Sequence, residues 1–387
     1  RKYMTSINNN TIVTLPVSLG EALDKLTILD IKLQKINDDR RNDVQVEYTM
    51  LKEKLTNELT ECSYYYRILK EINLSIWEMQ DDFRDKKGNQ TILCIKIIEE
   101  NDRRFRVKKK INDFINSSLK EQKGYARTKA IILTHLGNGD HLTCNGLVRY
   151  YSTKYDSVTV FCKKQNLHNL EEFYEDDKSI SFHCVESDFI YRPREVEKYA
   201  KNNNYNNVIV SGHIKDNTYD DLPFCFYQFL DLPHNVFWNY FHVPTLPKSQ
   251  ELYNSIKNYD YIFVHNQCSR GEMFKVEEIF KQINENTLVI NPCKNFYSKN
   301  HKYYDIAQTL CNESISSYKL IMENAKINVV CDSSFFCFMI NLELKYDDNF
   351  LYKVSNGNWD YTKIFEKYSF DNTKINRKKF KLFENKI

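Results

Sequence analysis

A glycine-rich segment at residues 135–146 holds the first candidate catalytic group, Asp140. Three of the nine glycines in the 387-residue chain lie in it. Glycines permit a tight turn and let a backbone approach a ligand closely. The segment follows an apolar run, and because open α/β sheets bind ligands at the carboxyl ends of their strands, the Asp140 carboxylate would be presented to the cleft. Asp140 can equally be a helix N-cap, and the residues alone leave both interpretations open.

A second segment, residues 331–336, has the composition of an anion-binding turn. Asp332, Ser333 and Ser334 follow an apolar run and precede a helical pattern. Hydroxyl groups and unpaired backbone N–H groups at a helix start can bind an anion. The simpler alternative is that Asp332 or Ser333 only caps the helix.

A third segment, residues 264–271, contains Ser269 and Arg270. The planar guanidinium of Arg270 could bind phosphate through paired hydrogen bonds. The alternative is an ordinary surface loop. Glu186 follows another apolar run and is expected to line the same cleft as Asp140. Neither G-x-G-x-x-G nor G-x-x-x-x-G-K-[ST] occurs, so nucleotide binding through those two motifs is disfavoured.

The residue types do not predict a metal site. His135, His141 and His265 lie near loop ends but lack a third ligand at metal spacing. None of the eleven cysteines forms a C-x-x-C pair, which argues against a zinc knuckle. We expect free thiols in a reducing compartment.

Composition limits the classes of function further. The 55 basic and 52 acidic residues give a formal charge of +3, too balanced for a protein that mainly binds nucleic acid or an anionic membrane. No apolar run approaches the ~18 residues of a spanning helix, and no signal-peptide pattern occurs. We therefore expect a cytoplasmic protein without a membrane span.

Residues 16–125 read as helices, because they contain only three glycines and no proline after Pro16. Ser18 and Glu21 form a capping-box pattern. Apolar residues recurring at intervals of three and four predict helices at 19–38, 44–61, 64–86 and 91–118. Their short connections favour antiparallel neighbours, hence a helical hairpin or bundle.

After Gly124, short apolar runs alternate with helical stretches, including a helix expected at 142–151. Such runs suit strands that are covered on both faces, as in parallel α/β sheets. Four prolines between residues 223 and 247 suggest a hinge between two α/β halves. The expected domains are 1–125, 126–245 and 246–387. The expected strands are 130–134, 158–162, 180–184, 208–211, 261–265, 288–291 and 327–331.

Residues 132–151, ILTHLGNGDHLTCNGLVRYY, resemble the opening strand and loop of GT-B glycosyltransferases of the heptosyltransferase type. NVVCDSSFFCFMINL resembles the donor-binding Asp-Ser/Thr segment of that group, and FVHNQCSRG its donor-phosphate loop. LPFCFYQFLDLPHNVFWNYFHV resembles a segment of related surface-glycan transferases. The resemblance covers about residues 128–345. Phe336 and Cys337 depart from it, replacing a small residue and a histidine.

This resemblance implies an α/β fold with two Rossmann-like halves in GT-B arrangement. A nucleotide sugar would bind mainly the second half, and a glycan or glycoprotein acceptor the first. It implies inversion at the anomeric carbon with no metal or other cofactor. Asp140 would be the general base. The donor would be held by Ser269, Arg270, Asp332, Ser333 and Ser334. The acceptor side of the cleft would include Gly139, His141, Asn145 and Glu186.

The helical region contains LPVSLGEALDKLTILDIKLQKI, LSIWEMQDDFRDK and ENDRRFRVKKKIN. These are similar to a small helical domain of uncharacterised function in bacterial and giant-virus chains. The abundance of Asn, Lys, Ile and Tyr would suit a giant virus. If the chain is viral, the protein is expected in the host cytoplasm or in the virion. The amphipathic faces of the helical region could pack on the transferase, form a homodimer or bind a partner. Its polar groups, such as Asp24 and Asp30, are expected to make contacts within the domain.

A competing hypothesis is a non-catalytic glycan- or nucleotide-binding module, or a scaffold of a glycan-assembly system. A nucleotidyl- or phosphate-processing enzyme is a third possibility, disfavoured because acidic metal-binding clusters are missing from the sequence.

Overall fold

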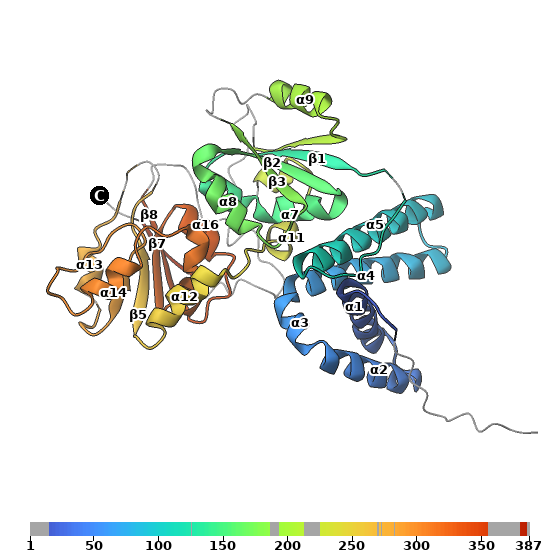
Figure 1. Cartoon of the computed structure of the whole chain (residues 1–387), viewed down its shortest axis with the longest axis horizontal. Helices are drawn as coiled ribbons and strands as arrows, with labels where there is room; N and C mark the ends of the chain where they lie inside the picture. Colours follow the sequence, from blue (N-terminus) through green and yellow to red (C-terminus); the bar gives the residue numbers. More distant parts are fainter. Residues whose placement is uncertain are drawn as a thin grey trace, which may run out of the picture. The chain divides into compact units, whose positions relative to one another are not determined.

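The computed structural model describes residues 15–354, apart from 125, 186–192, 213–224, 269–270, 272 and 282, together with residues 380–384. The chain divides into two compact units, residues 1–126 and 127–387 (Figure 1). Three residues expected at the site, Glu186, Ser269 and Arg270, lie outside the described residues.

Unit 1 is helical, as the apolar periodicity predicts. The helix expected at 44–61 begins earlier, after the N-cap Asp39, and is interrupted at Leu55. Leu55 is buried, whereas α2 has no buried residue. The helices are α1 (Leu19–Lys35), α2 (Arg40–Lys54), α3 (Thr56–Glu61), α4 (Ser63–Arg84) and α5 (Gln90–Phe114).

Helix α1 packs against α2, α4 and α5. Its start is fixed by Ser18, whose Oγ accepts a hydrogen bond from the Glu21 N–H at 3.3 Å, so the predicted N-cap is confirmed. At Gly20 an added Cβ would lie only 2.6 Å from the Lys108 carbonyl oxygen. A residue without a side chain is therefore required where α1 crosses α5.

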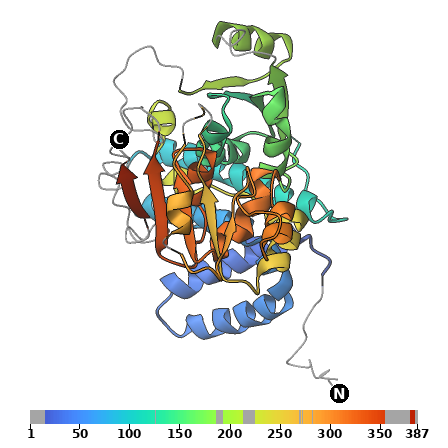
Figure 2. The same ribbon diagram turned by 90° about the vertical axis from the view of Figure 1, so that its left-hand side faces the viewer.

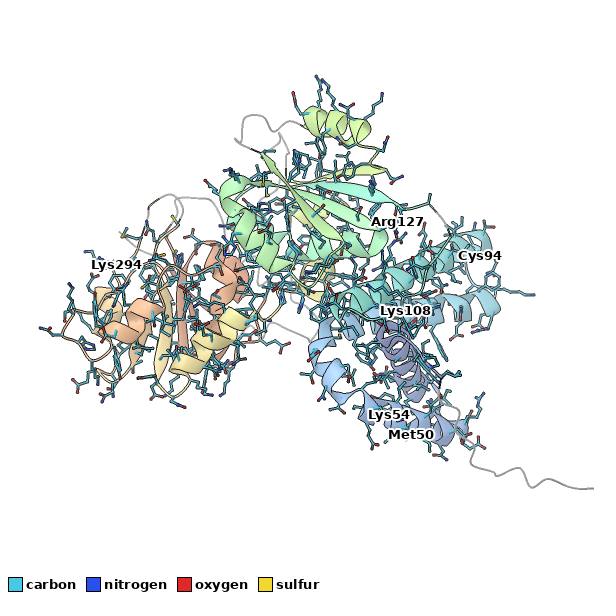
Figure 3. The ribbon with its side chains drawn as sticks, in the orientation of Figure 1. Met50, Lys54, Cys94, Lys108, Arg127 and Lys294 are labelled. Carbon is cyan, nitrogen blue, oxygen red and sulfur yellow. The ribbon has the colours of Figure 1, made fainter. Side chains whose placement is uncertain are left out.

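Polar side chains of unit 1 bond within the unit, as expected. The Asn73 side chain of α4 donates to Asp24 and Thr27 of α1, both at 2.8 Å. Lys108 of α5 lies 2.5 Å from Glu21 and 2.8 Å from Glu121 (Figure 3). Burial favours its neutral amine, but hydrogen bonds to these two carboxylates raise the pKa of Lys108. These contacts join elements of the bundle that are distant in sequence.

Unit 2 begins with a parallel four-stranded sheet of order β3-β2-β1-β4. The central strand β1 is buried on both faces from Ala130 to Leu133, which explains its unbroken apolar sequence. Its strands are β1 (Lys129–Leu133), β2 (Ser157–Lys163), β3 (Ile180–Val185) and β4 (Asn207–Val210). Its helices are α6 (Asn138–Thr143), α7 (Asn145–Lys154), α8 (Leu167–Phe173) and α9 (Pro193–Asn202).

A second parallel sheet has the order β6-β5-β7-β8-β9, with β9 at its edge beside β8 (Figure 2). Its strands are β5 (Tyr261–His265), β6 (Leu288–Ile290), β7 (Ile327–Cys331), β8 (Asp348–Lys353) and β9 (Phe380–Glu384). Its helices include α12 (Pro247–Ile256), α13 (Glu277–Phe280), α14 (Tyr304–Thr309), α15 (Lys319–Asn324) and α16 (Ser334–Met339). A 3-10 turn, η3 (Ile315–Tyr318), precedes α15.

The expected fold, helices followed by two Rossmann-like α/β halves, is confirmed, and all seven expected strands are present. Strands β8 and β9 were not expected. Their sequences, DNFLYK and FKLFE, mix charged with apolar residues and lack the continuous apolar run of a doubly covered strand. In the part of the chain that the structure describes, no helix is long and apolar enough to cross a membrane.

The segment joining the two halves contains α10 (Cys225–Gln228) and α11 (Asn235–Asn239). It is anchored by Arg149 of α7, whose Nε donates to the His242 carbonyl at 2.7 Å. The same guanidinium forms two hydrogen bonds with the Asp176 carboxylate, at 2.7 and 3.1 Å. The two side chains are 1% and 2% exposed, so this charge pair is fully desolvated.

Replacing Arg149 with Ala is expected to lower the free energy of unfolding by about 3–5 kcal/mol, because the buried Asp176 carboxylate would lose both hydrogen bonds to the guanidinium. Urea unfolding followed by tryptophan fluorescence measures this. Lys326→Ala is the control: its pair with Asp260 has side chains 50% and 66% exposed, so a loss below about 1 kcal/mol is expected. Equal losses in both variants would contradict the structural role of Arg149.

Candidate functional site

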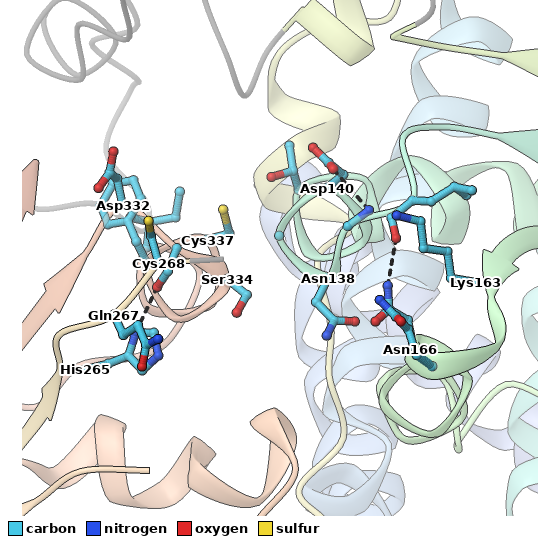
Figure 4. A pocket seen from close by; sticks show the side chains of 18 of the residues that line it. Asn138, Asp140, Lys163, Asn166, His265, Gln267, Cys268, Asp332, Ser334 and Cys337 are labelled. Carbon is cyan, nitrogen blue, oxygen red and sulfur yellow. Dashed lines mark hydrogen bonds between the residues drawn. The ribbon is translucent and has the colours of Figure 1, made fainter. Parts of the chain in front are cut away.

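A cavity of about 640 Å³ lies in unit 2 and is lined by residues of both halves (Figure 4). Its walls are formed where β1, β2, β5 and β7 end and the following segments begin. Ligands of open α/β sheets bind at these carboxyl ends, and the volume falls within the common ~300–1,000 Å³ of small-molecule sites. It is therefore the candidate active site.

Asp140 lines this cavity and also stabilises the start of α6. Its Oδ2 accepts a hydrogen bond from the Gly137 N–H at 3.2 Å, and Gly137 is the N-cap residue of α6. The expectation that Asp140 is the N-cap is therefore wrong: Asp140 lies three residues after the cap residue, accepts a hydrogen bond from its N–H and also lines the cavity. The helix expected at 142–151 starts earlier, at Asn138, and breaks at Cys144 into α6 and α7.

The surroundings of Asp140 favour retention of a proton. Burial raises the pKa of its carboxyl group, and the charges of His135 and Lys163 together with the Gly137 N–H oppose that shift. A carboxylate with a raised pKa binds a proton more tightly than a solvated one. This is the property required of a general base that operates near neutral pH.

Gly139 lies where the two halves approach each other. A Cβ at this position would lie 3.6 Å from the Cys337 Sγ and 3.7 Å from the Ser334 backbone nitrogen. The start of α6 therefore packs directly against the start of α16, and these helices are in close contact. Asp140 and Ser334 lie on facing sides of the cavity (Figure 4).

The turn after β7 has the expected form, with Ser333 as the N-cap residue of α16. Ser333 Oγ lies 2.9 Å from His265 Nδ1 at the end of β5. Asp332 also lines the cavity, but its Oδ1 accepts a hydrogen bond from the Val354 N–H at 3.0 Å. That carboxylate therefore anchors the backbone that follows β8.

For two residues, His141 and Asn145, the prediction that they lie on the acceptor side of the cleft is wrong. His141 is 2% exposed and Asn145 is fully buried, and neither lines the cavity. Burial lowers the pKa of His141 to about 4, and Asn145 Oδ1 accepts from the His242 N–H at 2.9 Å. Successive helical residues point about 100° apart, so His141 turns into the core while its neighbour Asp140 faces the cavity.

Two lining residues, Lys163 and Asn166, were not singled out from the sequence. Lys163 ends β2 and Asn166 follows it, and the Asn166 side chain donates to the Leu136 carbonyl at 2.7 Å. Gln267 and Cys268, which belong to the segment 264–271 noted in the sequence, line the cavity after β5. The rule that ligands bind at the carboxyl ends of strands would have found Lys163 and Asn166 as well. Among the described residues, no group of three or more His, Cys, Asp or Glu side chains could hold a metal ion.

Comparisons with known proteins give one family match and remote structural similarity. Residues 13–134 match a family of unknown function (DUF6165), and no curated protein matches. The E. coli ADP-heptose lps heptosyltransferase II is 12% identical with a TM-score of 0.37, over 60% of this chain and 87% of that chain. A glycosyl transferase family 9 structure from Veillonella parvula DSM 2008 is 11% identical with a TM-score of 0.41, over 68% and 89%.

The burial of Asp140 predicts a pH-dependent stability difference between wild type and Asp140→Asn. The folded state raises the pKa of Asp140 above an unfolded value of ~3.9. The wild type therefore loses stability as the pH rises through the interval between these two values. Asparagine does not titrate, and its carbonyl oxygen can still accept the Gly137 N–H. As the pH is raised from about 4, thermal unfolding should show the variant gaining stability relative to wild type. A difference that does not change with pH would contradict the raised pKa.

Proposed function

We propose that unit 2 transfers a sugar from a nucleotide-sugar donor to a hydroxyl group of a glycan or glycoprotein acceptor. The observation that carries the proposal is that the Asp140 carboxylate and the Ser333–Ser334 turn line one cavity. They belong to the two segments that resemble the opening loop and the donor-binding segment of heptosyltransferase-type enzymes. The cavity thus combines a candidate base with a candidate anion-binding turn.

The second half is proposed to hold the donor through its diphosphate. Ser333 and Ser334 line the cavity, and their hydroxyl groups are proposed to contact the diphosphate. The Ser333 N–H donates to the Cys331 carbonyl at 2.8 Å. Ser269 and Arg270 follow Cys268, which lines the cavity, and are proposed to add a phosphate contact. Such donors stabilise the negative charge that develops on a departing phosphate.

The first half is proposed to bind the acceptor and supply the base. Asp140 takes the proton of the acceptor hydroxyl, and the resulting oxygen attacks the anomeric carbon of the sugar. The bond between that carbon and the diphosphate oxygen breaks, and the diphosphate leaves with the electron pair. Attack from the side opposite the leaving group inverts the anomeric configuration. Lys163 on the same wall favours the ionised form of Asp140.

Asp140→Asn is expected to lower the turnover number by roughly 10²–10⁴-fold, because a carboxamide cannot accept the proton. Donor affinity, measured by calorimetry, should change little. The matched control is Asp156→Asn. Asp156 also accepts a hydrogen bond from a backbone N–H, that of Thr128 at 2.8 Å, but at the opposite ends of the strands. Its loss should leave turnover near the wild-type value.

Before this comparison, a panel of nucleotide sugars is screened with the wild type for binding, sugar transfer and donor hydrolysis. The same screen also tests the competing hypothesis. Transfer or slow donor hydrolysis by the wild type supports an enzyme. Tight nucleotide-sugar binding without turnover supports a binding module instead. Unchanged turnover in Asp140→Asn would remove Asp140 from the proposed role.

Removal of metal ions is expected to leave the activity intact, since hydrogen-bond donors and Arg270 are proposed to neutralise the leaving diphosphate. The measurement is the rate of sugar transfer before and after dialysis against a chelator. A loss of activity that Mg²⁺ or Mn²⁺ restores would contradict this part of the proposal.

A further inference from the structure

His265 is a buried cavity residue that contacts the turn proposed to hold the diphosphate. It ends β5, is 6% exposed and lines the cavity. Its Nδ1 lies 2.9 Å from Ser333 Oγ, and its ring packs on Phe335 with centroids 4.4 Å apart. The same nitrogen is 3.7 Å from the Cys331 thiol. The ring is thus fixed in place by residues on both sides of Ser333.

The imidazole is uncharged near neutral pH, because burial lowers the pKa of His265 to about 4. It therefore adds no positive charge to the cavity, and its effect on a bound anion must come through hydrogen bonding. A neutral imidazole has one N–H donor and one acceptor nitrogen. Which nitrogen carries the hydrogen decides what Ser333 can do.

The Ser333 hydroxyl has a single hydrogen. If His265 Nδ1 accepts that hydrogen, Ser333 offers an anion only lone pairs. If Nδ1 instead carries its own hydrogen and donates it to Ser333 Oγ, the hydroxyl hydrogen is available to a phosphate oxygen. Only the second arrangement makes Ser333 a donor at the turn that begins α16.

We propose that His265 is a positioning residue for the donor diphosphate: its Nδ1–H holds Ser333 Oγ so that the Ser333 hydroxyl donates to a diphosphate oxygen. This inference rests on the proposed function, because it requires that an anion binds at the turn. It assigns His265 a role that acts through Ser333 and that differs from the role of the base, Asp140.

The neighbouring hydroxyl provides an internal comparison. Ser334 lines the same cavity, whereas the hydrogen bond of His265 is shared with Ser333. Removing His265 should therefore matter only while Ser333 is present, and it should matter equally with or without Ser334. Groups that act as one unit show this type of non-additivity.

The test is a double-mutant cycle measured by calorimetry with inorganic pyrophosphate and with ADP, GDP, UDP and CDP. His265→Ala is expected to weaken binding roughly ten- to hundredfold, as for the loss of a hydrogen bond to a charged group. In a Ser333→Ala background it should cause no further loss. In a Ser334→Ala background, His265→Ala should weaken binding by the same factor as in the wild type. His265→Asn, whose amide can replace the Nδ1 donor, should restore most of the affinity, whereas His265→Gln should not.

Thermal unfolding of each variant establishes that it is folded, and the Asn and Gln variants provide a comparison if Ala disturbs the packing on Phe335. An NMR spectrum of ¹⁵N-labelled histidine should show His265 protonated on Nδ1 when pyrophosphate is bound. Additive losses of His265 and Ser333, or protonation on Nε2, would overturn the positioning role while leaving the proposed function intact. A wild-type protein that binds none of these anions would overturn both.

Discussion

The contact between α6 and α16 is the interaction on which the candidate site depends. Each helix begins just after a central strand, β1 or β7, so each brings the polar residues of its first turn to the carboxyl edge of its sheet. At Gly139 an added Cβ would lie 3.6 Å from the Cys337 Sγ and 3.7 Å from the Ser334 backbone nitrogen, which is ordinary van der Waals contact. The two helix starts are therefore close together at this point, and Asp140 and the turn at Ser333 line one cavity.

Asp140 meets two demands with one carboxylate. It accepts a hydrogen bond from the N–H of the N-cap residue Gly137, and in the proposed function it also takes a proton. Its burial makes both possible, because low solvent access strengthens the hydrogen bond and raises the pKa of the carboxyl group. The cost is the desolvation of a charge, which Lys163 and His135 partly offset. The buried position of Asp140 that suits the proposed reaction therefore lowers the stability of the folded state.

The segment that joins the halves is fixed to both. Arg149 of the first half holds the His242 carbonyl. Lys319 of the second half donates to the Val243 carbonyl at 2.8 Å and to Thr245 Oγ1 at 3.0 Å. Three residues of this segment, His242, Val243 and Thr245, are therefore held by hydrogen bonds, one from the first half and two from the second. Because the cavity is lined by both halves, these anchors determine how its walls face each other.

Features that depend on periodicity and on residues near each other in the chain could be predicted from the amino-acid sequence. They are the cap of α1 at Ser18, the seven strands with continuous apolar runs, and the placement of Asp140 and Ser333 after strands. Which side chains reach the cavity depends on contacts between distant segments and could be seen only in the folded protein. His141 points into the core because successive residues of a helix point in directions about 100° apart. The edge strand β9 contains charged residues and lacks the apolar pattern of a buried strand. The Ser333–His265 contact joins residues 68 positions apart, and such a pairing follows from the strand order β5-β7, which no local pattern encodes.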